Sequence, residues 1–314
     1  MIKKAAAVLL LAAAVVAAAL PSAWGAQAAA GAVRLRIAYN PMPFNLPSIV
    51  EHEWELLKQE GVDAEYTSFT VGYAMSEAMA SGGLDIAPAM GLTSAIVARA
   101  GGRDLRIIGV YSQAPAAFGL AVRPGTRSLS NLKGARIAVP VGTEAHVLLA
   151  KILAEQGLTA RDVQLVNMLI PDGMAALQSG HVDAAMVVEP VMSRMQAAGQ
   201  IEVLRDGTGL IQGMTVTVVP GRLVGTAAVE LFERAHQASL QMIEENPKAV
   251  LQAAAGVLNL APALVEQMFS KYHFTRAITP EVRQEIEDTI AFLTEEGIIA
   301  RPVAIDELLA GYKN

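Results

Sequence analysis

The sequence predicts an α/β protein of two similar lobes, chiefly because one pattern occurs twice. The seven residues from Ser81 read Ser-Gly-Gly-Leu-Asp-Ile-Ala, and those from Ser179 read Ser-Gly-His-Val-Asp-Ala-Ala. Upstream, Arg-Ile-Ala begins one apolar run at Arg36 and another at Arg136. The two spacings, 98 and 100 residues, are nearly equal. Two matches in the same order indicate two related lobes, and a cleft between lobes is a common place for a ligand.

The N-terminus has the pattern of a secretory signal. Lys3 and Lys4 precede a 16-residue apolar run over 5–20, which Pro21 ends before a group of small residues. We expect cleavage near residues 25–28, so that residues 1–28 are absent from the mature, exported protein. The alternative is a membrane anchor, but spanning a ~30 Å bilayer takes about 20 apolar residues.

The composition narrows the functional classes. The chain has no cysteine, which excludes disulfides, thiol nucleophiles, thiolate metal sites and a lipid anchor on an N-terminal cysteine. The mature chain, about 290 residues long, can fold on its hydrophobic core alone. Removing Lys3 and Lys4 takes the net charge from −6 to about −8. Because the chain is acidic and has no basic cluster, we expect no nucleic-acid partner.

In the first lobe, strands alternate with helices, which predicts a parallel sheet with right-handed crossovers. A capping box at Ser48 and Glu51 predicts the start of the first helix, and glycines follow each of the helices. The expected strands are 34–39, 64–69, 84–87, 106–111 and 118–122, and the expected helices are 48–60, 73–81 and 92–100.

The second lobe repeats this order, and a helical segment follows it. The expected strands are 136–139, 163–166, 183–188, 203–204 and 215–219, and the helices are 143–156, 172–179 and 190–198. Further helices are expected over 227–246, 247–258, 262–271 and 280–296, three of them with proline in the first turn.

These elements predict a discontinuous first lobe. We expect the C-terminal helices to pack back onto it, so that lobe 1 comprises 32–122 plus 219–314 and lobe 2 comprises 123–218. Two strands, near 119–122 and 214–219, would cross between the lobes and form a hinge.

Loops at the carboxyl ends of the strands are the expected ligand site, because the next helices point their N-termini there. Six loops qualify: 40–46, 70–73, 90–94, 141–146, 167–174 and 189–191. Two of them place glycine amides and hydroxyls at a helix start, where the helix dipole favours an anion. They contain Gly91, Thr93 and Ser94 in lobe 1 and Gly142 and Thr143 in lobe 2. The alternative is that each hydroxyl only caps its helix.

Two further candidates carry ionisable groups. Glu189 ends an apolar strand, so its carboxylate is expected either to meet a cationic group of the ligand or to form a salt bridge between the lobes. His146 lies one turn into its helix, where it either contacts the ligand or packs as a hydrogen-bonded core histidine.

Other candidates follow from their positions in the six loops. Asp172 is also expected to cap a helix starting at Gly173. Phe44 and Tyr73 are expected either to cover an apolar part of the ligand or to belong to the core. The remaining candidates are Asn40, Asn45 and Leu92. Asp85 and Asp183, from the repeats, lie at the opposite strand ends, where we expect them to order a glycine turn.

No motif of an enzyme is present in the sequence. It has no Gly-x-Ser-x-Gly, no His-Glu-x-x-His and no P-loop, and its five histidines do not have the spacing of metal ligands. We therefore expect a binding protein with no cofactor and no metal.

The chain resembles the solute-binding proteins of ABC importers, in the group for taurine, aliphatic sulfonates, nitrate or thiamine-precursor pyrimidines. The similarity lies in Asn-Leu-Lys-Gly-Ala-Arg-Ile-Ala-Val-Pro from Asn131, Gly142-Thr143, and Leu-Gln-Ser-Gly-His-Val-Asp-Ala-Ala from Leu177. Val-Glu-Pro from Val188 and Ala-Phe-Leu-Thr-Glu-Glu-Gly from Ala291 extend it towards the C-terminus.

The resemblance implies the two-lobed type 2 periplasmic-binding-protein fold and a site residue set. In lobe 1 it would hold the anion with Gly91, Thr93 and Ser94, and in lobe 2 with Gly142, Thr143 and His146. The chain departs from the group at Ile96, where many relatives carry proline, and at Glu189, which is often neutral. An acid there disfavours nitrate and favours a zwitterion or an amine-bearing heterocycle.

The resemblance also implies partners and a location. A monomeric periplasmic protein would capture a small organic solute and deliver it to an ABC permease and its ATPase in the inner membrane. Two alternatives stay open at this point: an enzyme on the same two-lobed fold, and a ligand-sensing protein that acts on a receptor.

Overall fold

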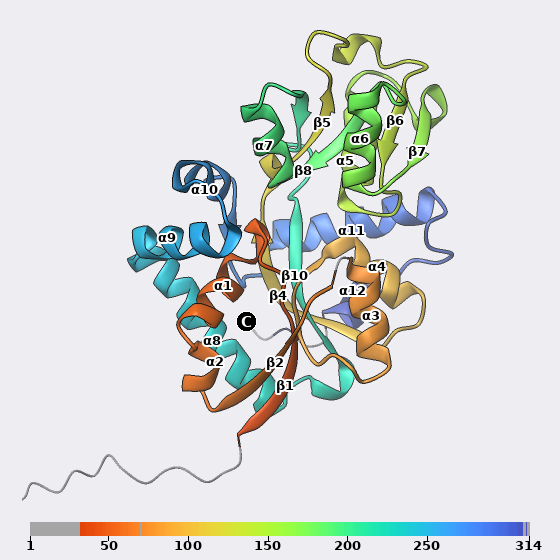
Figure 1. The fold of residues 1–314 in the computed structure, drawn as a ribbon. Coiled ribbons are helices and arrows are strands. Elements are labelled where there is room, and N and C mark those ends of the chain that lie inside the picture. The colour runs from red at the N-terminus through yellow and green to blue at the C-terminus, as the bar shows by residue number, and fades with distance from the viewer. Residues whose placement is uncertain (1–31, 70, 310–311, 313–314) are drawn as a thin grey trace, which may run out of the picture. The chain divides into compact units, whose positions relative to one another are not determined.

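Two β-sheets divide most of the strands between two lobes (Figure 1). The computed structural model describes residues 32–69, 71–309 and 312, so the predicted signal sequence over 1–28 lies outside the described residues. The first sheet has the order β11-β4-β10-β3, and its pairings are antiparallel. Its strands are β3 (Ala87–Gly91), β4 (Leu105–Gln113), β10 (Met214–Pro220) and β11 (His273–Phe274).

A parallel pair of strands lies beside the first sheet. β1 (Val33–Ala38) and β2 (Val62–Thr67) pair along their whole length, and one parallel bridge from Ile37 to Ile86 joins them to the residue before β3. Lobe 1 therefore combines parallel strands, as predicted, with antiparallel ones. The antiparallel character arises because β10 runs back from lobe 2 between β3 and β4.

The second sheet is also mixed. Its order is β7-β6-β8-β5-β9, in which β6 runs parallel to β7 and β8, and β5 runs antiparallel to β8 and β9. The strands are β5 (Phe118–Val122), β6 (Arg136–Val139), β7 (Gln164–Asn167), β8 (Ala184–Val188) and β9 (Glu202–Asp206).

Helices cover both sheets. Those of the strand–helix repeats are α1 (Leu46–Glu53), α2 (Leu56–Gln59), α3 (Gly72–Ala80), α4 (Leu92–Ala100), α5 (Glu144–Glu155), α6 (Ile170–Ser179) and α7 (Val191–Ala197). The C-terminal ones are α8 (Ala227–Glu245), α9 (Pro247–Leu258), α10 (Pro262–Phe269), α11 (Pro280–Glu295) and α12 (Ile305–Leu308).

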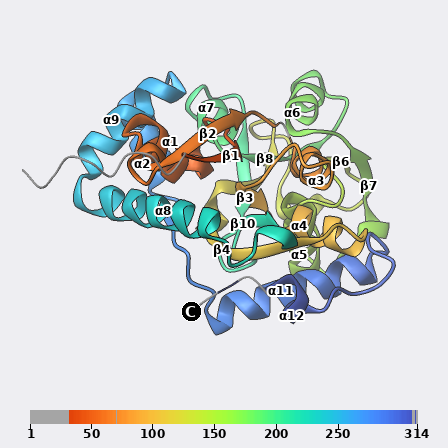
Figure 2. The ribbon, with the colours of Figure 1, turned by 90° about the horizontal axis from the view of Figure 1, so that it is seen from below.

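The C-terminal helices pack onto lobe 1, as expected, and they cover both faces of its sheet (Figure 2). Ile108 and Phe232 belong to one apolar cluster, shared by β4 and helices α8 to α10. The neighbouring Ile107 belongs to another cluster, with Ile286 of α11. Adjacent residues of a strand point to opposite faces, so the alternation in β4 separates the two helical layers.

No single helix in the described residues is long and apolar enough to cross a membrane. By length and composition, α9 and α10 together would be, but they meet at a bend of 112°.

The first helix differs from the prediction. It begins at Leu46, and Ser48 lies inside its first turn with its amide donating to the hydroxyl of Tyr111 at 2.8 Å, so the predicted capping box is not formed. The helix also ends at Glu53, because Glu55 adopts a left-handed conformation with φ of 50° before α2 begins.

The chain changes sheet in two short segments, 114–117 and 207–213, which lie side by side. The Ala114 amide donates to the carbonyls of Gln212 at 3.0 Å and Gly213 at 3.1 Å. Gly213 has φ of 59°, and a Cβ there would lie 2.5 Å from the Ala114 carbonyl oxygen, so this close approach requires glycine.

Each of the two strands that were expected to cross between the lobes belongs to one sheet only. The expected crossing strand near 119–122 lies in β5 of the second sheet, and the one near 214–219 lies in β10 of the first. A buried apolar run does not reveal which sheet it joins, so the sequence pattern left this open. The lobe limits at 122 and 219 stay a prediction.

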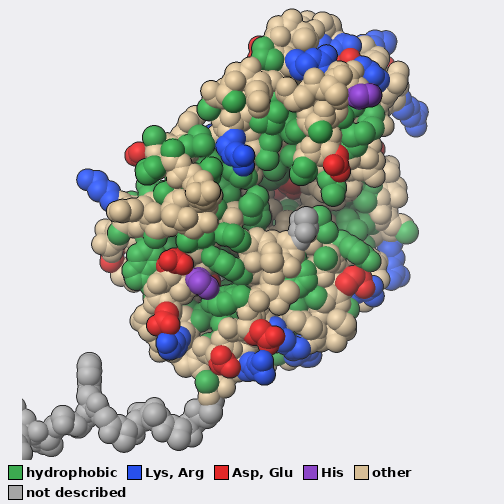
Figure 3. Space-filling view, in the orientation of Figure 1, with side chains coloured by type: hydrophobic (Ala, Val, Ile, Leu, Met, Phe, Trp, Pro, Cys, Tyr) green, Lys and Arg blue, Asp and Glu red, His purple; other side chains and the backbone are tan. Residues whose placement is uncertain are grey.

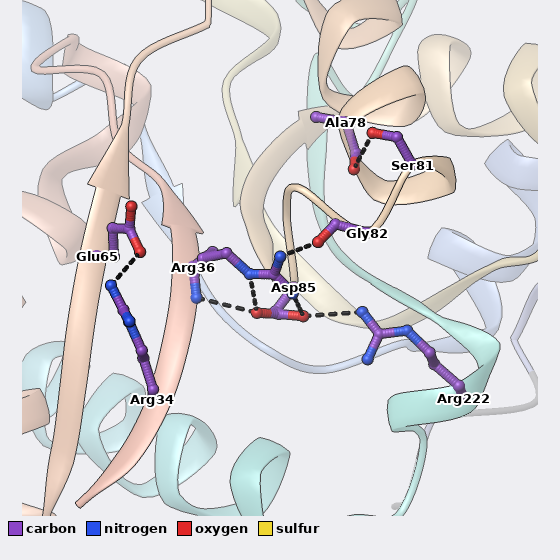
Figure 4. A network of polar contacts seen from close by, with 8 residues as sticks. All are labelled: Arg34, Arg36, Glu65, Ala78, Ser81, Gly82, Asp85 and Arg222. Atoms are coloured by element: carbon purple, nitrogen blue, oxygen red, sulfur yellow. Dashed lines mark hydrogen bonds and ion pairs between the residues drawn. The ribbon is translucent and has the colours of Figure 1, made fainter.

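The sequence repeat corresponds to a repeated ion pair. Asp85 accepts hydrogen bonds from Arg36, at 2.8 Å from Nε and 2.9 Å from Nη2, and Arg36 also donates to the carbonyl of Gly82 (Figure 4). In the second copy, Asp183 accepts from Nε and Nη2 of Arg136, each at 3.2 Å.

These pairs explain why arginine, glycine and aspartate recur together. In the second copy Arg136 donates to the Gly180 carbonyl at 3.0 Å, so in each lobe the arginine ties the glycine turn to the start of the next strand. The aspartates were expected to order the turn themselves, and their arginine partners were missed. Hydrogen bonds from Arg136 lower the pKa of Asp183 to about 2. Burial raises the pKa of Asp85, but its bonds to Arg36 and to Arg222 at 2.8 Å outweigh burial and lower it.

Candidate functional site

Four of the helices that follow strands have first amides that no N-cap side chain satisfies, a feature they share with most helices in the described residues. These are α3 and α4 in lobe 1 and α5 and α6 in lobe 2, and none has an N-cap side chain that accepts a hydrogen bond from the helix. Thr143 is the N-cap residue of α5, but its Oγ1 donates to the Pro140 carbonyl at 2.6 Å instead. The alternative that Thr143 only caps its helix is therefore wrong. Uncapped amides at a helix start are donors for an anion.

The starts of α3 and α4 approach each other closely. A Cβ added to Gly72 would lie 2.6 Å from Cβ of Ser94 and 2.7 Å from its Oγ. Real Cβ atoms do not come that near a neighbour, so glycine at position 72 allows the contact. Ser94 is half-buried, and its hydroxyl faces the first turn of α3.

The lobes meet at Thr93 and Glu144. Thr93 lies in the first turn of α4, Glu144 is the first residue of α5, and both side chains are buried. The Thr93 Oγ1 donates to Oε2 of Glu144 at 3.0 Å. The other carboxyl oxygen, Oε1, is buried and has no hydrogen-bond partner among the described residues. The sequence predicted Thr93 but missed Glu144, which directly follows the predicted Gly142 and Thr143.

Burial and a second acid perturb Glu144. Burial, strengthened by the charge of Glu285 on α11, raises its pKa to about 7, against the opposing effects of Thr93, Lys151 and the Gly213 amide. Burial also raises the pKa of Glu285, whose Oε2 lies 3.8 Å from Nζ of Lys151 on α5. The Lys151 ammonium donates to the Leu210 carbonyl at 2.7 Å. Helices of both lobes and the crossing segment over 207–213 thus meet in one polar cluster.

His146 has the contacts of a packed histidine. It is buried, its Nδ1 accepts from the Gly142 amide at 3.4 Å, and its ring meets Phe292 of α11 edge-on with centroids 5.7 Å apart. Burial lowers its pKa. A ligand contact by His146 stays a prediction.

Glu189 forms the bridge between lobes that was one of its two expected roles. Its Oε1 accepts from the Ser193 hydroxyl at 2.7 Å and pairs with Nζ of Lys271, which follows α10. Its Oε2 accepts from the Ser193 amide at 3.1 Å and so satisfies the start of α7. The Glu189 side chain is fully buried. Nothing in the sequence pattern pointed to Lys271.

Two asparagines brace the loop after β1. The Asn40 Oδ1 accepts from the Ser68 hydroxyl at 2.6 Å and the Phe69 amide at 3.0 Å. The Asn45 Nδ2 donates to the Asn40 carbonyl at 2.8 Å, while its Oδ1 is buried without a partner among the described residues.

The remaining candidates differ in exposure. Leu92 is fully buried and Phe44 half-buried, whereas Tyr73 is 70% exposed. Asp172 is exposed in the first turn of α6; because that helix begins at Ile170 with Leu169 as N-cap, the expected capping of Gly173 by Asp172 is wrong.

Exposed large hydrophobic side chains concentrate in three of the six predicted loops. In the described part of the chain they are Val71, Tyr73, Val141 and Leu169, from loops of both lobes. The Val141 amide donates to Oδ1 of Asn167 at 3.1 Å, which joins the two loops of lobe 2. Figure 3 shows hydrophobic side chains on both sides of a hollow in the middle of the face drawn there. Exposed apolar side chains in the predicted loops suit the apolar part of a bound molecule.

The predicted loops offer amide and hydroxyl donors, a buried acid and exposed apolar side chains. No three His, Asp or Glu side chains within the described ranges are grouped to hold a metal ion.

The chain is similar to known proteins in both sequence and fold. The sequence profile of the NMT1-like family matches residues 28–203. A protein of Escherichia coli strain K12 named as an aliphatic sulfonates-binding protein is 31% identical over 193 residues, which cover 61% of this chain and 60% of that relative. The taurine-binding periplasmic protein of the same organism is 24% identical over 85% of this chain and 88% of its own length.

A solved structure is also similar. The alkanesulfonate-binding protein SsuA from Xanthomonas axonopodis pv. citri, bound to MOPS, has a TM-score of 0.79 at 24% sequence identity, with 91% of this chain and 99% of that chain covered. The likeness confirms the predicted two-lobed fold class. The relatives named above are binding proteins, two of them named for sulfonates and one for taurine.

Proposed function

The chain belongs to the NMT1-like family, and on that premise we propose that it is the solute-binding component of an ABC importer. In this proposal the exported protein works in the periplasm as a monomer without catalysis. It closes its two lobes on a small organic solute with an anionic group, sulfonate-like in chemistry, and presents the closed form to a permease and its ATPase. Binding selects the closed state, which the permease distinguishes from the open one.

The observation that carries the proposal is the set of uncapped helix starts at the strand ends of both lobes. The first amides of α3, α4, α5 and α6 have no side-chain cap, and they follow β2, β3, β6 and β7. A sulfonate has three oxygens that accept hydrogen bonds, and such amides can neutralise it without a basic side chain. None of the candidate residues is lysine or arginine, which fits this mode of binding.

The exposed hydrophobic side chains support an organic rather than an inorganic solute. Tyr73 and Leu169 belong to different lobes, and each exposes more than half of its surface in a loop predicted to face the cleft. A solute with a carbon skeleton would cover part of this surface when the lobes close, which favours binding. Nitrate would leave it exposed.

Calorimetric titration of the mature protein with a panel of sulfonates, amino acids and pyrimidines tests the proposal. We expect one solute per chain, and for Thr93→Val or Thr143→Val a weakening of about tenfold or more, because in the proposal each hydroxyl turns from its present acceptor, Glu144 or the Pro140 carbonyl, to the anionic solute. Thr126→Val is the matched control, since Thr126 is exposed and donates to the Arg123 carbonyl away from these loops. If both variants stay within about twofold of the wild type, the assigned site is wrong.

A further inference from the structure

We propose that Glu144 determines the specificity of this site by requiring a solute that carries an N–H donor, such as an ammonium group, in addition to its anionic group. The inference rests on the proposed function, because it assigns a solute class to the same cleft. It moves to Glu144 the role that the sequence had suggested for Glu189, whose carboxylate is already occupied by Ser193 and Lys271.

The position of Glu144 is the first argument. Its carboxyl lies where the lobes meet, held through Oε2 by Thr93 of lobe 1. The nearby Gly213 amide lowers the pKa of this carboxyl, but Oε1 has no hydrogen bond of normal geometry to any described residue. A buried acceptor without a partner costs free energy, so a donor supplied by a solute would be favoured there. The contact has one half in each lobe, so both oxygens become accessible when the lobes separate.

The charges around Glu144 are the second argument. On its own helix α5 it shares the cluster with Lys151, whose ammonium lies near Glu285 and donates to the Leu210 carbonyl. From α11 it faces Glu285, from α4 the neutral Thr93, and from the crossing segment the Gly213 amide. His146, two residues further along α5, is directed to Gly142 and Phe292. Two acids therefore share one base, and the deficit of positive charge favours a cationic group.

The proposal predicts the direction in which the affinity for each kind of solute changes with pH. Burial, with the charge of Glu285, raises the Glu144 pKa to about 7, so this carboxyl gains its charge as the pH rises past that value. An ammonium-bearing solute should then bind more tightly at about pH 8 than at about pH 6, whereas a plain anion of the same skeleton should bind less tightly. A purely structural Glu144 would shift both solutes alike.

Matched probe pairs test the proposal by calorimetric titration of the mature protein. The pairs are taurine with ethanesulfonate, 3-aminopropanesulfonate with propanesulfonate, and β-alanine with propionate, and each differs by one ammonium group. We expect the ammonium member of at least one pair to bind about tenfold tighter than its partner at about pH 8, and Glu144→Gln to reduce that preference to about threefold or less. Glu295→Gln, which removes an exposed charge at the end of α11, should leave the preference unchanged.

The possible results distinguish a failure of the Glu144 inference from a failure of the proposed function. The inference is overturned if the plain anions bind as tightly as their ammonium partners, or if Glu144→Gln retains the full preference. If no member of any pair binds, the proposed function for this class of solute fails, and the inference fails with it. Should Glu144→Gln not fold, the opposite pH trends of the two members of a pair in the wild-type protein supply the same test.

Discussion

Replacing Glu144 with glutamine should change how the stability of the protein depends on pH. In the folded chain, burial and the neighbouring Glu285 raise the Glu144 pKa from its ordinary value of 4.5 to about 7. The folded state therefore holds a proton that the unfolded chain releases between these values. Stability contributed by the neutral form is complete at low pH and is lost as the pH rises towards 7. Glutamine stays neutral and has no such loss.

The size of this stability change follows from the difference between the Glu144 pKa values in the unfolded and folded states. At 1.36 kcal/mol per pH unit, the separation of 4.5 from about 7 corresponds to about 3 kcal/mol, most of which falls between about pH 5 and about pH 8. Urea unfolding of both proteins at these two pH values measures it. Relative to the wild type, the variant should gain about 2–3 kcal/mol in unfolding free energy on going to the higher pH.

Other titrating groups are present in both proteins, so their effects cancel to a first approximation in this comparison. Glu295→Gln is the control, because Glu295 is exposed and its replacement should leave the pH profile of the wild type unchanged. If the profiles of the wild type and Glu144→Gln run parallel within about 0.5 kcal/mol, Glu144 is ionised in the folded protein throughout, and the reasoning from its burial is refuted.

Three further predictions follow from contacts at the site and in the repeats. Gly72→Ala should weaken binding of the best solute about fivefold or more by calorimetry, because the added Cβ would lie 2.6 Å from Cβ of Ser94. Gly83→Ala is the control and should have no effect, since its nearest contact is at 3.5 Å. Equal affinities of the two variants would show that the start of α3 is not part of the site. Asp85→Asn should lower the unfolding free energy by about 2–3 kcal/mol in urea, since two arginines lose a charged acceptor, and an unchanged value would make this pair incidental. Glu189→Gln should destabilise the protein in the same assay but keep its preference for ammonium solutes, and a lost preference would place Glu189 in the ligand site instead.

The sequence indicated the order of strands and helices because that order depends on local periodicity and turn residues. The glycines after α3 and α6, the apolar strand before Glu189 and the late prolines at Pro247, Pro262 and Pro280 all have local causes. The break between α1 and α2 was missed, because Glu55 adopts its left-handed conformation without a glycine to signal it.

Hydrogen-bond and ion-pair partners that lie far apart in the chain could not be predicted from the sequence pattern. The loops of the site follow from the strand-end rule, but the contact between Thr93 and Glu144 joins residues 51 positions apart, and that between Glu189 and Lys271 joins residues 82 positions apart. Lys271 lies after a helix with no motif around it. Two aspartates of the repeats were noticed, yet their arginines were read only as strand starts, since a repeated ion pair needs the fold to bring its members together.

Hydrogen–deuterium exchange, with and without the panel solute that binds most tightly, tests the central claim most directly. If a solute is held between the lobes by uncapped helix starts, it should slow amide exchange in residues 71–76 and 91–96 of lobe 1 and also in 142–147 and 169–174 of lobe 2. Amides in the middle of α8, which contains none of the predicted site loops, should keep their rates. Protection confined to one lobe, or protection of α8 without these four segments, would contradict a site formed by both lobes.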